Sequence, residues 1–267
     1  MTDSHYIQLT RLTDEYSILG IAKTLDYEEQ MGIVYTFHST GIEGNTLSLQ
    51  ETTLAIKEGM IFKGKLKDYN EAKDHYNAYL KIIQLAKAKQ EITPELIKEI
   101  NADVMHSTGS VHNTPLGTYD GSKGEYRLQD VYAGTTRFPS CNKVPGMVDN
   151  FCSWANDQLN KVKSTEEILN LAADAHYKLV SIHPFIDGNG RTSRAIMNYM
   201  QLRFNKPLII LSQDNRFEYY KALQRTRKEE DISIIRTFIM EEHTPNLEYE
   251  IEKVKDPDGV KDIFLDL

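Results

Sequence analysis

Cysteine is scarce in this sequence, because the 267 residues include only Cys141 and Cys152. These two cysteines form neither a metal-binding pattern nor a disulfide framework. The chain also lacks an uninterrupted apolar run close to the length of a membrane-spanning helix. Its first residues, Met-Thr-Asp-Ser-His-Tyr, lack the basic and apolar regions of a signal peptide. We therefore expect a cytoplasmic protein that is not inserted in a membrane.

Positive charge is outnumbered by negative charge, with 31 lysines and arginines against 39 aspartates and glutamates. The resulting net charge of −8 argues against nonspecific binding to nucleic acid or to an anionic membrane. No internal repeat or low-complexity segment is present. Apolar residues make up 40% of the chain, which is enough for a real core.

Helical periodicity dominates the sequence and predicts a mainly α fold. The expected helices span residues 6–16, 27–43, 48–59, 68–90, 94–106, 144–160, 164–182, 191–204, 215–228 and 231–242. Residues 107–124 are rich in Gly, Ser, Thr and Asn and are expected to form a loop, and strand-forming residues from 124 onward predict a short β-hairpin near 130–139. We divide the chain into an N-terminal helical region (1–90), a core (91–245) and a C-terminal tail (246–267), which ends in a turn and a short apolar stretch at 263–265.

The most informative segment runs from His183 to Arg194 and reads His-Pro-Phe-Ile-Asp-Gly-Asn-Gly-Arg-Thr-Ser-Arg. Upstream, Ser164 and Glu167 have the spacing of a capping box that starts a helix. This helix is expected to end near His183, because the following proline disfavours helical geometry in the residue before it. A second helix begins after the glycines. The segment is therefore a helix–loop–helix in which Phe185 should point inward and anchor the loop.

The residue types in this loop suit a nucleotide. Unpaired amides at a helix N-terminus form an anion site, and glycines let the backbone approach phosphates closely. Arg191 and Arg194 supply guanidinium groups suited to phosphate oxygens. Asp187 offers a hard oxygen ligand for Mg²⁺, and a neutral His183 side chain is a candidate general base near pH 7.

A second motif, Ser-Thr-Gly-Ile-Glu-Gly-Asn, begins at Ser39. Ser39 and Glu43 lie four residues apart and share one face of a helix. Glu43 falls in the last turn of that helix, where the helix dipole disfavours a negative charge. This unfavourable position suggests that Glu43 has a partner elsewhere in the fold.

The segment from His183 to Arg194 resembles the signature His-x-Phe-x-(Asp/Glu)-Gly-Asn-Gly-Arg-x-x-Arg of the Fic-domain family at every position. The resemblance implies a Fic-type helical bundle with a hairpin flap over the active site. It also implies transfer of AMP from ATP, with Mg²⁺, to a hydroxyl side chain of a protein. The implied roles are His183 as the base that deprotonates the hydroxyl, Asp187 as the Mg²⁺ ligand, Gly188, Asn189, Gly190 and Arg191 for the α- and β-phosphates, and Arg194 for the γ-phosphate.

Three further features carry weaker resemblances to this family. Ser39-x-x-x-Glu43-Gly44 is similar to an inhibitory-helix pattern, here in a helix near 27–45, whose glutamate pairs with Arg194. A Gly-x-Tyr-Arg segment precedes the flap of relatives, as Gly-Glu-Tyr-Arg does here. Tyr220 matches a Tyr-Tyr pair of the nucleoside pocket, although a core aromatic would have the same spacing. Some relatives carry an Asn for adenine where this chain reads Thr226-Arg227-Lys228-Glu229.

Several alternatives remain open at the level of sequence. The same site could transfer UMP or phosphocholine, or remove AMP with Glu43 positioning a water molecule. The chain could also belong to a different functional class, as a nucleotide-binding regulatory module without transferase activity. Such a module would not need a general base. Self-modification and a homodimer also remain open.

Overall fold

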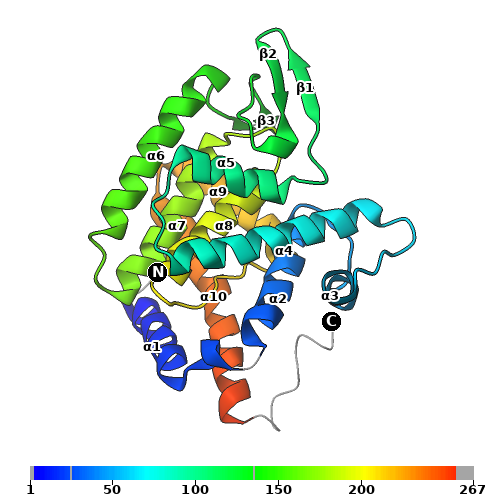
Figure 1. Cartoon of the computed structure of the whole chain (residues 1–267). Helices are drawn as coiled ribbons and strands as arrows, with labels where there is room; N and C mark the ends of the chain where they lie inside the picture. Colours follow the sequence, from blue (N-terminus) through cyan, green and yellow to red (C-terminus); the bar gives the residue numbers. More distant parts are fainter. Residues whose placement is uncertain (1–2, 25, 135, 257–267) are drawn as a thin grey trace.

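The computed structural model describes residues 3–24, 26–134 and 136–256, and these form a mainly helical fold (Figure 1). This confirms the expected fold class of a helical bundle with short β-hairpins. The helices are α1 (Asp3–Leu19), α2 (Tyr27–Ile42), α3 (Leu49–Glu58), α4 (Leu66–Lys87), α5 (Pro94–Val104), α6 (Val144–Leu159), α7 (Thr165–Ile182), α8 (Asn189–Arg203), α9 (Arg216–Glu229) and α10 (Ile232–Lys255). The division of the chain at residues 90 and 245 stays a prediction.

Helix α8 is the central helix of the described fold. Every residue from Arg191 to Gln201 is buried, so the helix has no solvent-facing stripe. It packs against α7, α4 and α5, and α2 approaches it as well. This arrangement fixes the N-terminus of α8, where the expected nucleotide loop lies, inside a rigid frame of helices.

The sequence signals at the start and at the end of α7, the helix before this loop, have the expected effects. Ser164 accepts a hydrogen bond from the amide of Glu167 at 3.2 Å, and the capping box at the start of α7 is complete. Helix α7 ends at Ile182, and His183 adopts the left-handed conformation with φ of 53°. Pro184 explains this ending, because its ring disfavours helical geometry in the residue before it.

Two small antiparallel hairpins lie near α5, at the top of Figure 1. One pairs β3 (Tyr132–Ala133) with β4 (Thr136–Arg137) and confirms the hairpin expected at 130–139. The other pairs β1 (Val111–Thr114) with β2 (Gly117–Asp120), with Val111 opposite Asp120. The expectation of a plain loop over 107–124 was therefore wrong. These strands are too short for alternation to stand out against a composition typical of turns.

The last helix is longer than the sequence suggested. We expected it to end at residue 242, but α10 continues to Lys255 with Pro245 inside it. A proline within a helix removes one hydrogen bond and costs about 3 kcal/mol. Burial of Leu247 and Ile251 beyond the proline offsets this cost. The expected apolar stretch at 263–265 lies outside the described residues.

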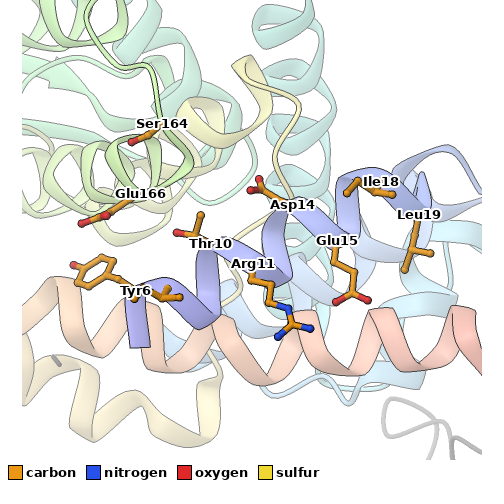
Figure 2. A pocket seen from close by; sticks show the side chains of 10 residues that line it. Tyr6, Thr10, Arg11, Asp14, Glu15, Ile18, Leu19, Ser164 and Glu166 are labelled. Atoms are coloured by element: carbon orange, nitrogen blue, oxygen red, sulfur yellow. The ribbon is translucent and has the colours of Figure 1, made fainter. Parts of the chain in front are cut away.

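Helix α1 packs along α10 and α7 and leaves part of its surface open. Figure 2 shows the hollow beside it, which extends from Tyr6 to Leu19 and reaches Ser164 and Glu166 at the start of α7. Ile7 is 68% exposed on this helix. Within the described ranges, none of the helices combines the length and the apolar character needed to cross a lipid bilayer.

Candidate active site

The loop between α7 and α8 is held rigidly by its own side chains. Asn189 Oδ1 accepts a hydrogen bond from the amide of Phe185, and Asn189 Nδ2 donates to the Phe185 carbonyl, both at 2.9 Å. Phe185 is 1% exposed, as expected for the anchor of the loop. The Asn189 side chain therefore serves the loop itself, and only its backbone amide is placed for phosphate.

The N-terminus of α8 has the geometry of an anion site. Gly188 precedes the helix with φ of 75°, and a Cβ there would lie 2.8 Å from Asn101 Nδ2 and from Met105 Sδ. Only glycine avoids both the strain and these contacts. The amides of Asn189, Gly190 and Arg191 form the first turn, where the helix offers them no carbonyl partner. They can therefore bind phosphate oxygens.

Asn101 of α5 supports this turn, and it was not expected from the sequence. Its Nδ2 donates to the Asp187 carbonyl at 3.2 Å and to Thr192 Oγ1 at 3.0 Å. Asn101 is 1% exposed. A single asparagine in a helix carries no signal in sequence, because its partners lie 86 and 91 positions further along the chain.

His183, the expected general base, packs against the flap. Its ring stacks on Phe138 of the flap, with centroids 3.8 Å apart and an interplanar angle of 19°. Burial lowers the pKa of His183 to about 4, so the ring is neutral near pH 7. Nδ1 lies 3.3 Å from the Val180 carbonyl oxygen. This contact favours the tautomer with hydrogen on Nδ1 and leaves the Nε2 lone pair able to accept a proton.

Arg127 joins the flap to the backbone of His183. It is fully buried and donates from Nε to the His183 carbonyl at 2.8 Å. Its two terminal nitrogens donate to the carbonyls of Gln129 at 2.7 Å and Pro139 at 2.6 Å, on either side of the β3–β4 hairpin. The Gly-Glu-Tyr-Arg segment suggested a place near the flap, but only the structure shows this bridging role.

Arg194 lies in α8 one turn beyond the loop and is paired with the end of α2. Its Nη2 donates to Glu43 Oε1 at 2.7 Å and to the Ser39 carbonyl, and its Nε donates to Ser39 Oγ at 2.9 Å. Burial alone would lower the pKa of Arg194, but the Glu43 charge raises it above its usual value. The sequence-predicted pair of Glu43 and Arg194 is thus present, and Ser39 belongs to the same cluster.

The Glu43 carboxylate occupies the anion site itself. A Cβ on Gly190 would lie 2.1 Å from Glu43 Oε1, so the carboxylate rests directly on the first turn of α8. Arg194 Nη1 is buried without a protein hydrogen-bond partner. A carboxylate and a phosphate both suit helix amides and guanidinium groups. Glu43 therefore lies over helix amides that could otherwise bind an anion.

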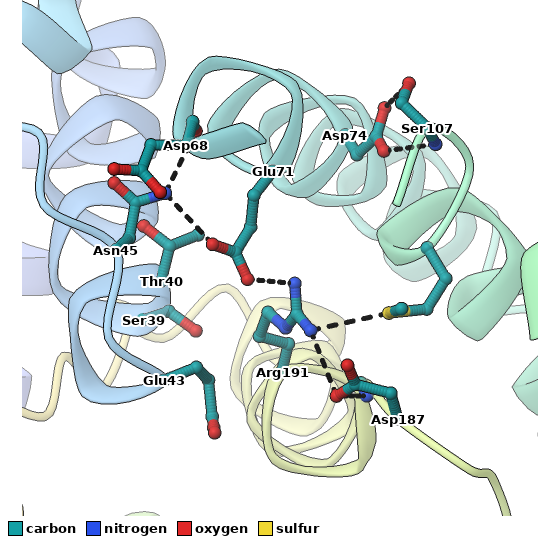
Figure 3. A network of polar contacts seen from close by, with 12 residues as sticks. Ser39, Thr40, Glu43, Asn45, Asp68, Glu71, Asp74, Ser107, Asp187 and Arg191 are labelled. Carbon is teal, nitrogen blue, oxygen red and sulfur yellow. Dashed lines mark hydrogen bonds and ion pairs between the residues drawn. The ribbon is translucent and has the colours of Figure 1, made fainter. Parts of the chain in front are cut away.

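Arg191 was expected to bind phosphate, and in the structure its guanidinium contacts two carboxylates of the protein. Its buried guanidinium forms an ion pair with Glu71 of α4 through Nη1, and Nη2 lies 3.3 Å from Asp187 Oδ1 (Figure 3). The other oxygen of Glu71 accepts from Asn45 Nδ2 at 3.1 Å. Glu71 was not among the expected site residues. It connects the loop arginine to the turn that follows Glu43.

Asp187 fits a metal ion that arrives with a nucleotide. Its side chain is 68% exposed and offers hard carboxylate oxygens at the mouth of the loop. Mg²⁺ in phosphate-transfer sites is commonly held by one or two carboxylates together with substrate phosphates. Across the described segments, no group of three or more His, Cys, Asp or Glu side chains could hold a metal by itself. Phosphate oxygens and water would therefore have to complete the coordination.

Tyr220 lies at the edge of this site rather than inside the core. Its hydroxyl donates to the Ile42 carbonyl at 3.1 Å, and its ring is 39% exposed. Its neighbour Tyr219 is the buried member of the pair, with its hydroxyl 3.0 Å from His176 Nε2. Tyr220 thus contacts the end of α2 and stays accessible to a nucleoside.

A histidine of lowered pKa beside a helix N-terminus that carries two arginines makes this a candidate nucleotide site in a helical domain with a hairpin flap. Residues 91–201 match the Fic/DOC family, and the chain therefore carries a Fic/DOC domain.

Known relatives and structures agree with this assignment. The protein adenylyltransferase Fic of Aedes aegypti is 35% identical over 199 residues, which cover 74% of this chain and 37% of that protein. The chain thus spans little more than a third of this curated relative. Fic-1 from C. elegans superposes with a TM-score of 0.77 at 26% identity, covering 94% of this chain and 73% of that one. A Fic domain containing signaling protein from Bacteroides thetaiotaomicron shares the fold with a TM-score of 0.79 at 23% identity, covering 93% and 97%.

Proposed function

We propose that this protein transfers AMP from ATP to a hydroxyl side chain of a protein. The observation that carries the proposal is the neutral His183, held by the flap beside the anion site at the N-terminus of α8. A module that only binds nucleotide needs no base at this position. Adenylyltransferase relatives at about a third identity support the same donor.

In the proposed reaction, the target hydroxyl attacks the α-phosphorus of ATP. His183 Nε2 takes the hydroxyl proton, the new P–O bond joins AMP to the target, and the bond to pyrophosphate breaks. The amides of Gly190 and Arg191 stabilise the negative charge on the phosphate oxygens. Stacking on Phe138 keeps the histidine ring in place. Pyrophosphate then leaves.

Asp187 would hold Mg²⁺ together with the nucleotide phosphates, and the ion would supply charge neutralisation there. Gly188 provides the turn that exposes the helix amides. Arg194 would bind the γ-phosphate, and Arg191 would reach the phosphates after leaving Glu71. Tyr220 would contact the nucleoside from the rim of the site.

We further propose that Glu43 inhibits this reaction. The hydrogen bond from Arg194 at 2.7 Å and the contact with Gly190 support this proposal, because the carboxylate would compete there with phosphate. Ser39 reinforces the inhibited arrangement by accepting from Arg194 Nε. Inhibition then needs no large movement, because a carboxylate and a phosphate compete for the same donors.

The proposal is tested by incubating the Glu43→Gly variant with a cell lysate and ATP labelled on the α-phosphate. Protein bands that appear on addition of the variant with the α-label, and that its addition does not produce with the γ-label, show transfer of AMP rather than phosphate. Unlabelled UTP should compete poorly, and the variant that also carries His183→Ala should give no label. Label that persists without His183, or that appears only with another nucleotide, would overturn the proposal.

A further inference from the structure

A groove of about 720 Å³ lies beside the flap, between α6, α7 and α9, and we call it the flap groove. Its lining includes Arg137 and Phe138 of the flap and the aromatic residues Phe151 and Trp154 of α6. Lys178 of α7 and Arg227 of α9 line it as well. None of the expected site residues lines it.

The flap groove opens directly beside the proposed base. Phe138 stacks on the ring of His183 and also lines the groove, so one aromatic ring separates the two. Ile182, the residue before His183, lines the groove as well. A segment lying in the groove would therefore pass next to a hydroxyl placed at His183.

The charge of the groove contrasts with the charge of the chain. Its lining includes three cations and no carboxylate, although the chain as a whole carries a net charge of −8. Lys178 lies 4.8 Å from the ring centroid of Trp154, and Arg227 lies 5.3 Å from that of Phe138. In the described part of the chain neither cation is paired with a carboxylate. Arg137 alone has one, Asp130, at 3.3 Å on the flap.

We propose that the flap groove binds the segment of the target protein next to the acceptor hydroxyl. It selects a segment with an aromatic or large apolar side chain flanked by acidic residues. The aromatic residues of the lining match the first feature, and the cations match the second by charge complementarity. The inference rests on the proposed transfer of AMP to proteins and specifies its substrates.

Binding can be measured without activity, because Trp154 is the only tryptophan of the chain and lies in the groove. The probes are two short peptides that share an acceptor tyrosine and a phenylalanine, with flanking glutamates in one and lysines in the other. We expect the glutamate peptide alone to change the tryptophan emission, and added salt to weaken its effect. Equal responses to both peptides, no response, or a response to ATP alone would overturn the inference.

A charge reversal sharpens the test. Lys178→Glu should weaken binding of the glutamate peptide by about threefold to tenfold and strengthen binding of the lysine peptide. The matched control is Lys161→Glu, on an exposed lysine just beyond α6 that pairs with Asp157 outside the groove. This control should leave both affinities unchanged. Equal effects of the two substitutions would show that the preference for the glutamate peptide comes from the overall charge of the protein, and would refute the proposal.

Transfer assays separate this inference from the proposed function. In the Glu43→Gly background, Lys178→Glu should raise KM for the glutamate peptide and lower it for the lysine peptide. If no peptide and no protein accepts AMP, the proposed function fails, while the fluorescence titration still decides whether the groove binds acidic segments. If transfer occurs with no dependence on flanking charge, only the flap-groove inference fails.

Discussion

Replacing Glu43 is the perturbation that the structure defines best. Glu43 Oε1 accepts a hydrogen bond from Arg194 Nη2 at 2.7 Å, and the arginine side chain is 1% exposed. Glu43→Gly removes the carboxylate altogether. Glu43→Gln keeps the shape of the side chain and removes its charge. We expect both variants to transfer AMP faster than the native protein, with Glu43→Gly the faster of the two.

The size of the expected increase in AMP transfer follows from the hydrogen bond that is lost. A hydrogen bond to a charged group contributes about 1.5–3 kcal/mol. Since about 1.4 kcal/mol is a factor of ten, removing this competitor should raise ATP affinity or turnover about tenfold to a hundredfold. The buried Arg194 would then lack its counter-charge until a phosphate replaces it. ATP should therefore raise the melting temperature of the variants by more than that of the native protein.

The assay is auto-modification and target modification over a range of ATP concentrations, with thermal unfolding measured in parallel. The double variant Glu43→Gly with Arg194→Ala should return to low activity, because no cation remains for the γ-phosphate. Equal rates for native and Glu43→Gly proteins at every ATP concentration would refute the inhibitory role of Glu43. The AMP-transfer proposal would survive that result, because it rests on the loop after α7.

Four further predictions follow from the site. His183→Ala should reduce transfer by about 10²–10⁴-fold while calorimetry still detects ATP binding, because the residue acts on the hydroxyl and not on the phosphates. Asp187→Ala should abolish activity together with its Mg²⁺ dependence, and unchanged metal affinity in a titration would place the ion elsewhere. Glu71→Ala should lower the free energy of unfolding in denaturant by about 3–5 kcal/mol, because it removes the buried partner of Arg191 and leaves only the exposed Asp187. A loss below about 1 kcal/mol would show that Asp187 or another group replaces Glu71. Because the pKa of His183 is lowered to about 4, the single-turnover rate should hold between about pH 7 and about pH 5 and fall only as the pH approaches 4. The stability that the fold gains from keeping this ring neutral is complete above the unfolded pKa of about 6.5 and is lost as the pH falls toward 4. A single-turnover rate that falls around pH 6.5 would contradict the lowered pKa.

The sequence predicted the elements whose signals are local. The capping box at Ser164 and the proline after His183 set both ends of α7 correctly, since each acts within a few residues. The same reasoning failed at Pro245, where burial beyond the proline outweighed a local rule. It also failed for the β1–β2 hairpin, whose four-residue strands are too short to show alternation.

The sequence by itself determined the helical class and the loop from His183 to Arg194, because helix periodicity, caps and a contiguous motif are all written within short stretches of chain. Only the tertiary structure decided what those residues meet. The pair of Glu43 and Arg194 spans 151 positions, and the ion pair of Glu71 and Arg191 spans 120. The first pair was expected from a family resemblance, and the second carries no local signal. Contacts across such distances depend on how α2, α4 and α8 pack together, and packing depends on the whole chain at once.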